Sequence, residues 1–479
     1  MNYRIIAKIL SRVMTIEALL MILPVITALI YGESIVCFLL TMLIAGALAY
    51  LLSLLKPRRK DLYAREGFVS VSLSWILMSL VGALPFFFSG AIPSYVNAVF
   101  ETVSGFTTTG ATILTNVEAM SRGLLFWRSL TQWIGGMGVL VFIMAVLPLA
   151  EEHSMYIMRA EVPGPLVDKL VPHIRSSTTI TYLIYICLTA MLVILLCCGG
   201  MPVFDSLIHA MSAAGTGGYS LKNLSVGYYD SAYIDIVIGI FVLLFGVNFS
   251  IYFLLLMRKF KKAFSNSELL CYIGIVAFST ITIAINILGI YGTPGRALRF
   301  SFFQVASTIT TTGFATADFG LWPSYSQCML ILLMFIGACS GSTGGGIKVS
   351  RLVLLAKSTK DEIVKLINPR KVTAITMDGQ QIDAATIRST QVFFALYMVT
   401  TFIACLIVSL DNFDFSTSFS AVVTCISNVG PGIGLVSPSG NFSIFSDLST
   451  IVLSLCMLIG RLEVFPLLLL ASPSIWRRK

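Results

Sequence analysis

The feature that most limits how this chain can fold is its series of long apolar stretches. A helix of about 20 residues crosses the roughly 30 Å hydrocarbon core of a bilayer and satisfies its own backbone hydrogen bonds there. Only 11% of the 479 residues are charged, whereas a soluble protein carries about 25%. The sequence therefore predicts an all-α polytopic membrane protein. A short turn and a second apolar stretch follow the first stretch, so we do not expect it to be a cleaved signal peptide.

Basic residues indicate on which side of the membrane each loop lies. Most form clusters between apolar stretches, such as 56–60, 258–262 and 477–479, so the net charge of +9 does not indicate nucleic-acid binding. Because cytoplasmic loops are enriched in Lys and Arg, these clusters predict ten crossings with both termini in the cytoplasm. The basic residues placed outside or within spans are Arg122, Arg128, Lys222, Arg296, Arg299, Lys348 and Arg461.

After two N-terminal helices the chain repeats one unit four times, and each unit has a first span, a polar segment and a second span. The first spans are expected at about 66–88, 178–198, 268–291 and 391–410, and the second at about 127–149, 232–257, 326–357 and 447–471. The resulting divisions are two helices at 1–60, pore units 1 to 4 at 61–160, 175–262, 265–358 and 389–479, and a cytoplasmic connector at 359–388.

The four polar segments, here called filter stretches 1 to 4, share one spacing. In each, a Ser or Thr is followed six residues later by a glycine. The residues just before each stretch can form a short helix that does not cross the membrane. Ordinary external loops are the alternative, but they would not repeat this spacing four times. The stretches are "SGFTTTGAT" (104–112), "SAAGTGGYS" (212–220), "STITTTGFA" (307–315) and "TCISNVGPG" (424–432).

This pattern predicts an ion filter. Non-helical backbone within a membrane is tolerated where it is buried in protein or lines a watery path. Four turns around one axis would present rings of carbonyl oxygens that replace the water shell of a monovalent cation, and glycine accepts the required dihedral angles. No carboxylate lies in the stretches, which disfavours divalent ions. The candidate ligands are Thr107, Thr108, Thr109, Gly110, Gly215, Thr216, Gly217, Gly218, Thr310, Thr311, Thr312, Gly313, Ser427, Asn428, Val429 and Gly430.

Together with "FWRSLTQWIGGMGVLVF" (126–142), "GSTGGGIK" (341–348) and "IGRLEVFP" (459–466), the filter stretches resemble the TrkH-type subunits of the Trk/Ktr/HKT potassium-transport superfamily. The resemblance covers essentially the whole chain. It implies a bacterial cytoplasmic (inner) membrane protein with a pseudo-fourfold pore, a homodimer, and a cytosolic TrkA-like nucleotide-binding regulatory ring. In that family, glycine at all four filter positions accompanies preference for potassium, while serine at the first admits sodium; this chain has Gly110 there. "SNVG" in stretch 4 departs most from "TTTG".

The stretch "CSGSTGGGIKVS" (339–350) interrupts the second span of unit 3. It is not a Walker A loop, because Lys348 is followed by Val349 rather than by Ser or Thr. As one helix, residues 324–357 would be about 51 Å long, far more than a bilayer core requires. The sequence therefore predicts a break in this span.

Arg461 lies about 21 Å along the last span, counted from Asp447. A charge at that depth faces a cavity or a partner, or it snorkels to the interface. Glu463 is on nearly the opposite helical face, so carbonyls and hydroxyls of 339–346 are the better candidates. We hypothesise that a gate below the filter comprises Cys339, Ser340, Gly341, Ser342, Thr343, Gly344, Gly345, Gly346, Lys348 and Arg461.

Other polar residues have weaker signals. Glu101 could brace the filter, and His209 is expected to be a structural residue. Asp205, Asp411 and Asp414 could cap short helices or draw cations to the mouth. The connector 358–388 is either a solvated linker or a docking surface for the regulatory ring.

Taken together, these features predict that the chain takes up potassium, is not an enzyme and needs no organic cofactor. A sodium-permeable or weakly selective cation channel of the same fold is the alternative, and Gly110 argues against it. The chain contains no nucleophile, metal cluster or catalytic dyad, and the missing Walker chemistry opposes a membrane enzyme that uses the Gly-rich loop. A non-conducting scaffold or sensor would not need four matched stretches, and a tetrameric potassium channel would not need four non-identical stretches in one chain.

Overall fold

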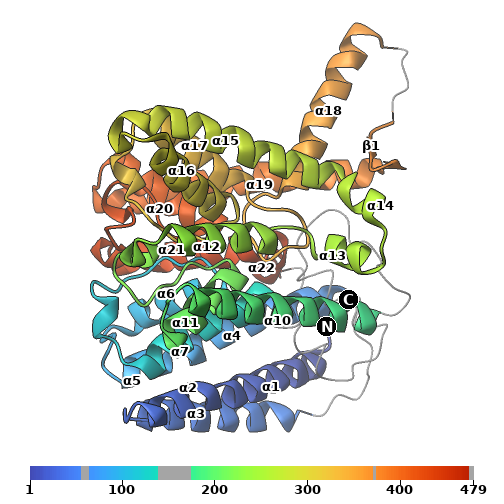
Figure 1. Cartoon of the computed structure of the whole chain (residues 1–479). Coiled ribbons are helices and arrows are strands. Elements are labelled where there is room, and N and C mark those ends of the chain that lie inside the picture. Colours follow the sequence, from blue (N-terminus) through green and yellow to red (C-terminus); the bar gives the residue numbers. More distant parts are fainter. Residues whose placement is uncertain (56–63, 139–173, 370–373, 474–479) are drawn as a thin grey trace.

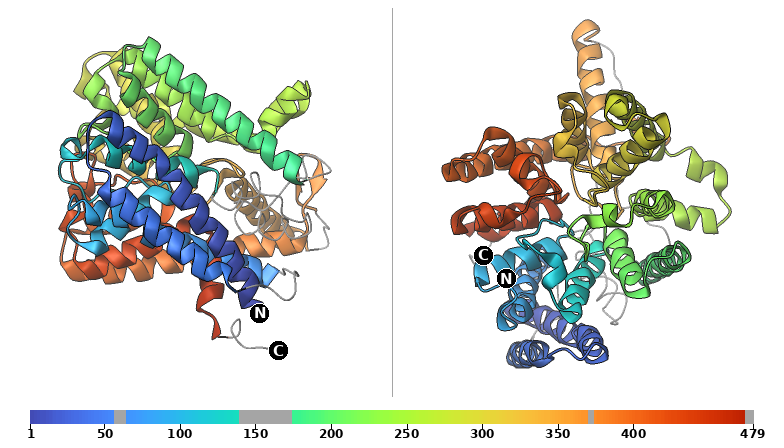
Figure 2. Two further views of the ribbon diagram at one scale, coloured as in Figure 1. Left: turned by 90° about the horizontal axis from the view of Figure 1, so that it is seen from below. Right: turned by 60° about the vertical axis from the view of Figure 1, so that its left-hand side comes forward.

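The computed structural model describes residues 1–55, 64–138, 174–369 and 374–473. Almost all of the regular structure is helical, with one two-stranded hairpin of β1 (Thr376–Met377) and β2 (Gln380–Gln381). In the right-hand view of Figure 2, the four units surround a common centre in chain order. The N-terminal helices lie outside this arrangement, at the bottom of Figure 1.

The N-terminal helices pack against unit 1 without joining the centre. Apolar side chains of α3, such as Leu43, are exposed on the outside, as expected of a helix facing lipid. On the inner side, α1 packs against both α3 and the first span of unit 1. The helices are α1 (Tyr3–Leu20), α2 (Ile22–Ile30) and α3 (Val36–Ser53).

Each unit contains a short helix between its two spans, called here the pore helix. Unit 1 has α4 (Ala64–Gly82), α5 (Leu84–Phe88), pore helix α6 (Tyr95–Phe106), η1 (Val117–Ala119) and α7 (Arg122–Gly136). Unit 2 has α10 (Ile174–Cys198), pore helix α11 (Val203–Gly215), η2 (Ser225–Tyr229), α12 (Ala232–Phe245), α13 (Phe249–Leu256) and α14 (Phe260–Phe264).

Units 3 and 4 repeat the order. Unit 3 has α15 (Ser267–Tyr291), pore helix α16 (Pro294–Ile309), η3 (Phe319–Leu321), α17 (Ser324–Ile336) and α18 (Val349–Ile367), which projects away from the other helices in Figure 1. Unit 4 has α19 (Ala384–Val408), η4 (Ser409–Asp411), pore helix α20 (Phe415–Ser427), η5 (Gly434–Val436), η6 (Phe442–Ile444), α21 (Asp447–Arg461) and α22 (Phe465–Ala471).

The second spans of units 2, 3 and 4 are not continuous helices. The break predicted in unit 3 is present, between α17 and α18. The expectation of unbroken spans at 232–257 and 447–471 is wrong: α12 and α13 meet at 90°, and residues 462–464 separate α21 from α22. Among the described residues, six helices are long and apolar enough to cross a membrane, or seven if α12 and α13 form one span. The expected span 127–149 runs past residue 138, outside the described ranges.

Local chemistry explains the two unexpected breaks. At the first, the side chain of Asn248 accepts a hydrogen bond of 2.9 Å from the backbone N–H of Ser250 and so caps α13. At the second, Glu463 and Val464 have φ angles of +58° and +66°, and Pro466 lies in the first turn of α22. Neither break interrupts the apolar composition, which is why periodicity alone did not predict them.

Glycines let two second spans approach the ends of their own pore helices. A Cβ at Gly135 would collide with the carbonyl oxygen of Phe106, and one at Gly460 with that of Ile426. Phe106 and Ile426 each lie four residues before the filter glycine of their stretch. The same backbone contact therefore holds the pore helix of unit 1 and that of unit 4.

We expect Gly135→Ala and Gly460→Ala each to lower the free energy of unfolding by about 1–3 kcal/mol, because the added methyl group meets backbone that cannot rotate away. Gly274→Ala is the matched control, since Gly274 lies in the span α15 with open space around it. Unfolding of the purified variants in detergent micelles titrated with SDS would measure the change. Equal stability of all three variants would contradict the close packing.

Candidate functional site

All four pore helices end in the same hydrogen-bonded turn, a Schellman motif. In each, a backbone N–H in the filter stretch donates to the carbonyl of the residue five positions earlier. The donor–acceptor pairs are Thr109 to Ser104 (2.9 Å), Gly217 to Ser212 (2.9 Å), Thr312 to Ser307 (2.8 Å) and Val429 to Thr424 (2.9 Å). The acceptors are the backbone carbonyls of the four Ser and Thr residues that precede the filter glycines by six positions, so the repeated interval coincides with one repeated turn.

The residue at the corner of each turn adopts a left-handed backbone conformation. These residues are Thr108, Thr216, Thr311 and Asn428, with φ angles of +54°, +53°, +58° and +57°. Asparagine is favoured over threonine at such a position. The departure of "SNVG" from "TTTG" in stretch 4 therefore preserves the same turn.

The four filter glycines form a closed ring of backbone contacts. Each has a positive φ, from +74° at Gly218 to +101° at Gly430. A Cβ at each would collide with a carbonyl oxygen of the next stretch: Gly110 with Gly217, Gly218 with Thr312, Gly313 with Val429, and Gly430 with Thr109. The contacts run from stretch 1 through 2, 3 and 4 and back to 1. Glycine is required at all four places by both conformation and space.

A cavity of about 140 Å³ opens on one side of this ring and is lined by all four filter glycines. Its lining includes Arg128 and Lys222 but no Asp or Glu. Asp205, Asp411 and Asp414 do not line this cavity.

These aspartates instead make structural contacts. Asp414 caps α20 by accepting from the Thr417 N–H at 3.1 Å, and hydrogen bonds from Ser416 and Thr417 hold its pKa below the ordinary value. Asp411 accepts from the Ser446 N–H at 3.0 Å.

Two further residues of unit 2 are held by hydrogen bonds. Asp205 accepts from the Tyr229 hydroxyl at 2.6 Å. His209 is buried between the Asp205 carbonyl, 2.8 Å away, and the Ser220 hydroxyl, 3.1 Å away, which fits the expected structural role.

The loop between α17 and α18 packs directly against filter stretches 3 and 4. The Gly345 N–H donates to the Thr311 hydroxyl at 2.6 Å. A Cβ at Gly345 would meet the carbonyl of Ser427, and one at Gly344 would come within 2.9 Å of the carbonyl of Thr310. The three consecutive glycines thus allow backbone to lie against backbone.

This loop is anchored on its other sides by polar groups from unit 2 and α15. Glu268 accepts from the N–H groups of Ser340 (2.6 Å) and Ser350 (3.1 Å) through one carboxylate oxygen, a role that the sequence analysis missed. Unit 2 makes three bonds with the loop: the Cys339 N–H donates to the Gly246 carbonyl (3.1 Å), the Thr343 hydroxyl donates to the Phe245 carbonyl (3.2 Å), and the Phe249 N–H donates to the Gly341 carbonyl (3.1 Å). Within the loop, the Ser342 hydroxyl donates to the Cys339 carbonyl (2.6 Å). The ammonium of Lys348, which is buried, donates to the carbonyl of Gly344.

Arg461 bonds to this loop and to unit 1 at the same time. Its guanidinium donates to the carbonyls of Thr343 (2.8 Å), Gly135 (2.5 Å) and Gly136 (2.8 Å). This agrees with the expected carbonyl partners and disfavours snorkelling. Glu463 pairs instead with Arg351 of α18, at 2.5 Å.

Comparisons with known proteins agree with this geometry. Residues 34–478 match the TrkH family, described as cation transport protein. The Trk system potassium uptake protein TrkH of Salmonella typhimurium is 37% identical over 485 residues, and that of Escherichia coli K12 is 36% identical over 487 residues, each covering 100% of both chains. The crystal structure of the potassium transporter TrkH from Vibrio parahaemolyticus matches with a TM-score of 0.89 and 31% identity, again over 100% of both chains.

This chain belongs to the TrkH family. The family resemblance and the all-α polytopic fold class are confirmed. Because its relatives are components of a transport system, the chain is a transporter and not an enzyme, and its apolar helices make it an integral membrane protein.

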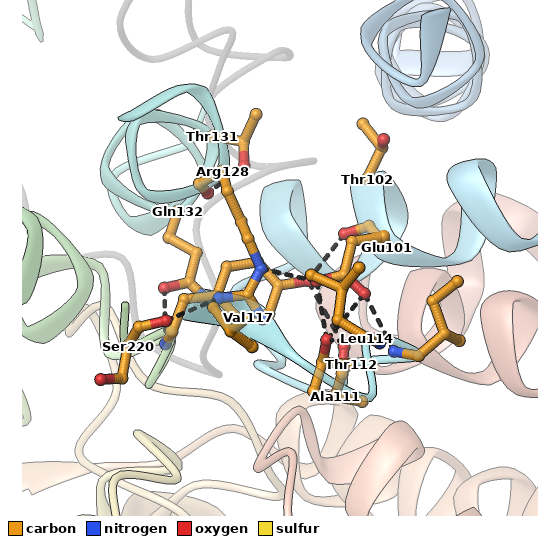
Figure 3. Close-up of polar contacts among 12 residues, drawn as sticks. Glu101, Thr102, Ala111, Thr112, Leu114, Val117, Arg128, Thr131, Gln132 and Ser220 are labelled. Atoms are coloured by element: carbon orange, nitrogen blue, oxygen red, sulfur yellow. Dashed lines mark hydrogen bonds and ion pairs between the residues drawn. The ribbon is translucent and has the colours of Figure 1, made fainter. Parts of the chain in front are cut away.

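A buried ion pair links filter stretches 1 and 2 of this TrkH-family chain (Figure 3). Arg128 of α7 and Glu101 of α6 lie 2.6 Å apart, with side chains 3% and 0% exposed. Glu101 also accepts from the Thr112 hydroxyl and the Ile113 N–H, both at 3.0 Å, as the expected bracing role requires. Arg128 donates to the Ser220 carbonyl at 3.0 Å, so the pair joins stretches 1 and 2.

Arg128, expected in an external segment, lies in α7, and Gln132, which was not among the predicted site residues, lies one turn further along the same helix. The Gln132 amide bonds to the backbone of stretch 2. The signal available for both residues was their position in "FWRSLTQWIGG", where polar side chains interrupt an apolar helix. Three further acidic residues, Glu118, Asp230 and Asp318, contact Lys222, Arg299 and Ser439 respectively.

We expect Arg128→Met to lower the free energy of unfolding by about 3–5 kcal/mol, because it leaves the carboxylate of Glu101 buried without its counter-charge. The double variant Glu101→Gln/Arg128→Met removes both charges and should be less destabilised than Arg128→Met alone. SDS titration of the purified proteins in micelles would compare them. This account would be contradicted if the destabilisation of the double variant equalled the sum of the destabilisations of Glu101→Gln and Arg128→Met.

Proposed function

We propose that this chain takes up potassium ions, which pass along the axis surrounded by the four filter glycines. The observation that carries the proposal is the closed ring of glycine–carbonyl contacts, which brings four similar turns of one chain around one point. The printed names of the relatives, potassium uptake proteins of the Trk system, support the choice of ion.

The proposed filter consists of the four residues up to and including each glycine, from Thr107 to Gly110 and the corresponding residues of the other stretches. Their carbonyl oxygens would replace the hydration shell of a potassium ion. The C-terminal, negative ends of the four pore-helix dipoles lie at this ring and would stabilise a cation there. A sodium-permeable pathway of the same fold is the alternative. Glycine at all four positions argues against it.

Below the filter, we assign the gate to residues 339–346, Lys348 and Arg461. Two observations support this. The glycines of the loop lie against the last residues of pore helices α16 and α20 and the filter stretches that follow them, and Arg461 connects the loop to unit 1. A cationic guanidinium next to the pathway would oppose the passage of potassium until it moved.

The proposed partners are a second copy of the chain and a cytosolic TrkA-like nucleotide-binding ring. The name of the relatives, a Trk system, supports other Trk components as partners. The proposed location is the bacterial cytoplasmic membrane, with both termini inside. The divisions 1–60, 61–160, 175–262, 265–358, 359–388 and 389–479 remain our proposal for how the chain is organised.

We expect cells of a potassium-uptake-deficient bacterium that express the chain to take up rubidium, with potassium but not sodium as an effective competitor. Gly110→Ser should weaken that discrimination, because a side chain there displaces the Gly217 carbonyl. Gly46→Ser is the matched control, since Gly46 has open space around it in α3. Equal competition by the two ions in the unsubstituted protein would overturn the potassium assignment.

Arg461→Gln removes the charge while keeping an amide that can donate to the loop. We expect rubidium flux to rise roughly tenfold, which corresponds to about 1.4 kcal/mol of barrier height. Arg258→Gln, at an exposed position after α13, should leave flux unchanged. Alanine at Gly344, Gly345 and Gly346 should alter flux as well, because these side chains would push the loop away from stretches 3 and 4. Unchanged flux in both sets of variants would exclude the proposed gate.

A further inference from the structure

Filter stretches 1 and 3 are stiffened by their own threonines. In stretch 1 the hydroxyls of Thr107 and Thr109 lie 2.8 Å apart, and in stretch 3 those of Thr310 and Thr312 lie 2.7 Å apart. Each pair joins the residues three and one positions before the filter glycine. The hydrogen bond crosses the left-handed corner of the turn, so it restrains the carbonyl groups on either side of it.

Stretch 2 cannot use this device. The corresponding residues are Gly215 and Gly217, which have no side chains. A Cβ at Gly215 would collide with the backbone carbonyl of Gln132, and a Cβ at Gly217 would collide with the Gln132 side chain. Helix α7 of unit 1 thus lies too close for threonines at these positions.

Gln132, whose backbone and side chain leave no room for the threonines, also bonds to stretch 2. The amide nitrogen of Gln132 donates to the Gly217 carbonyl at 2.6 Å, and its amide oxygen accepts from the Tyr219 N–H at 3.1 Å. These two bonds hold the backbone on both sides of Gly218. Because a carbonyl needs a donor and an N–H needs an acceptor, the two partners also determine the orientation of the amide. Gln132 is fully buried.

The position of unit 2 that corresponds to Gln132 is occupied by an apolar residue, Val242. Gly136 of α7 packs against Gly215 and the Tyr185 hydroxyl, and the residue after α12 packs in the same way in the next unit. There Gly246 lies against Thr310 and the Tyr272 hydroxyl. Four residues before these glycines are Gln132 and Val242.

Unit 4 also has an apolar residue, Met457, at the position that corresponds to Gln132. Gly460 packs against its pore helix as Gly135 does, and the residues three positions earlier are Met457 and Gln132. Around the ring, unit 2 with Val242 is followed by unit 3, and unit 4 with Met457 is followed by unit 1. The stretches of units 3 and 1 contain the threonine pair. Unit 1 with Gln132 is followed by unit 2, whose stretch lacks the pair. Stretch 4, which also lacks the pair, is held by a hydrogen bond of 2.7 Å between the hydroxyls of Ser427 and Tyr397.

We infer that Gln132 is a positioning residue that maintains the preference of the filter for potassium over sodium. The inference rests on the proposed function. A carbonyl that moved inward would fit the smaller sodium ion, and the Gln132 bond opposes that movement of the Gly217 carbonyl. Since a carbonyl oxygen has two lone pairs, it accepts from Gln132 and remains available to an ion.

The test compares Gln132→Leu and Gln132→Glu with the unsubstituted chain, using inhibition of rubidium uptake by potassium and by sodium. Leucine loses both bonds, and a glutamate carboxylate cannot donate to the Gly217 carbonyl. For each we expect the ratio of the half-inhibiting sodium and potassium concentrations to fall roughly fivefold, the effect of losing one ordinary hydrogen bond. Gln327→Leu is the matched control, because Gln327 is a partly buried glutamine of α17 whose amide donates to the carbonyls of Gly320 and Trp322, outside the filter contacts.

A second readout does not require transport. Potassium should raise the melting temperature of the purified chain more than sodium does, and the Gln132 variants should lose most of this difference while Gln327→Leu keeps it. A residue that only stabilised the fold would lower the melting temperature in both salts equally.

The outcomes separate the inference from the proposed function. If Gly110→Ser weakens selectivity while both Gln132 variants retain it in uptake and in melting, the inference is wrong and the potassium filter stands. If the unsubstituted chain does not distinguish the ions, the proposed function itself fails.

Discussion

The constraint on which this structure depends is the need to satisfy backbone polar groups where a chain turns inside a membrane. Four pore helices end at that depth, and each leaves carbonyls without partners within its helix. The Schellman turn satisfies them with N–H groups from the filter stretches, and the same turn brings a glycine to the ring. The ring of carbonyl contacts is therefore a consequence of how the helices end.

Sequence alone predicted those parts of the site whose hydrogen bonds are local. The six-residue interval from Ser104 to Gly110 reports one turn of backbone, so it recurs wherever the turn does. The break between α17 and α18 was predictable because three glycines cannot continue a membrane helix of that length. The partners of Arg461 were predictable in kind, since a guanidinium within a membrane span needs acceptors and residues 339–346 supply one of them.

Contacts between distant segments were not predictable in this way. Gln132 and Gly217 are 85 residues apart, and Glu268 and Ser340 are 72 apart. A single sequence contains no sign that these residues meet. The breaks after Phe245 and Arg461 were not predicted for a different reason, because broken and continuous spans have the same apolar composition. Only Asn248 and Pro466 mark these interruptions in the sequence.

A single chain that supplies all four stretches also has a genetic consequence. In a ring of identical subunits, one codon change appears four times and every position changes together. Here a codon change alters one quarter of the ring, as the different supports of the four stretches illustrate: hydroxyl pairs for stretches 1 and 3, Gln132 for stretch 2, and Tyr397 for stretch 4. Mutation can therefore change this ring one quadrant at a time, with three quadrants left as they were.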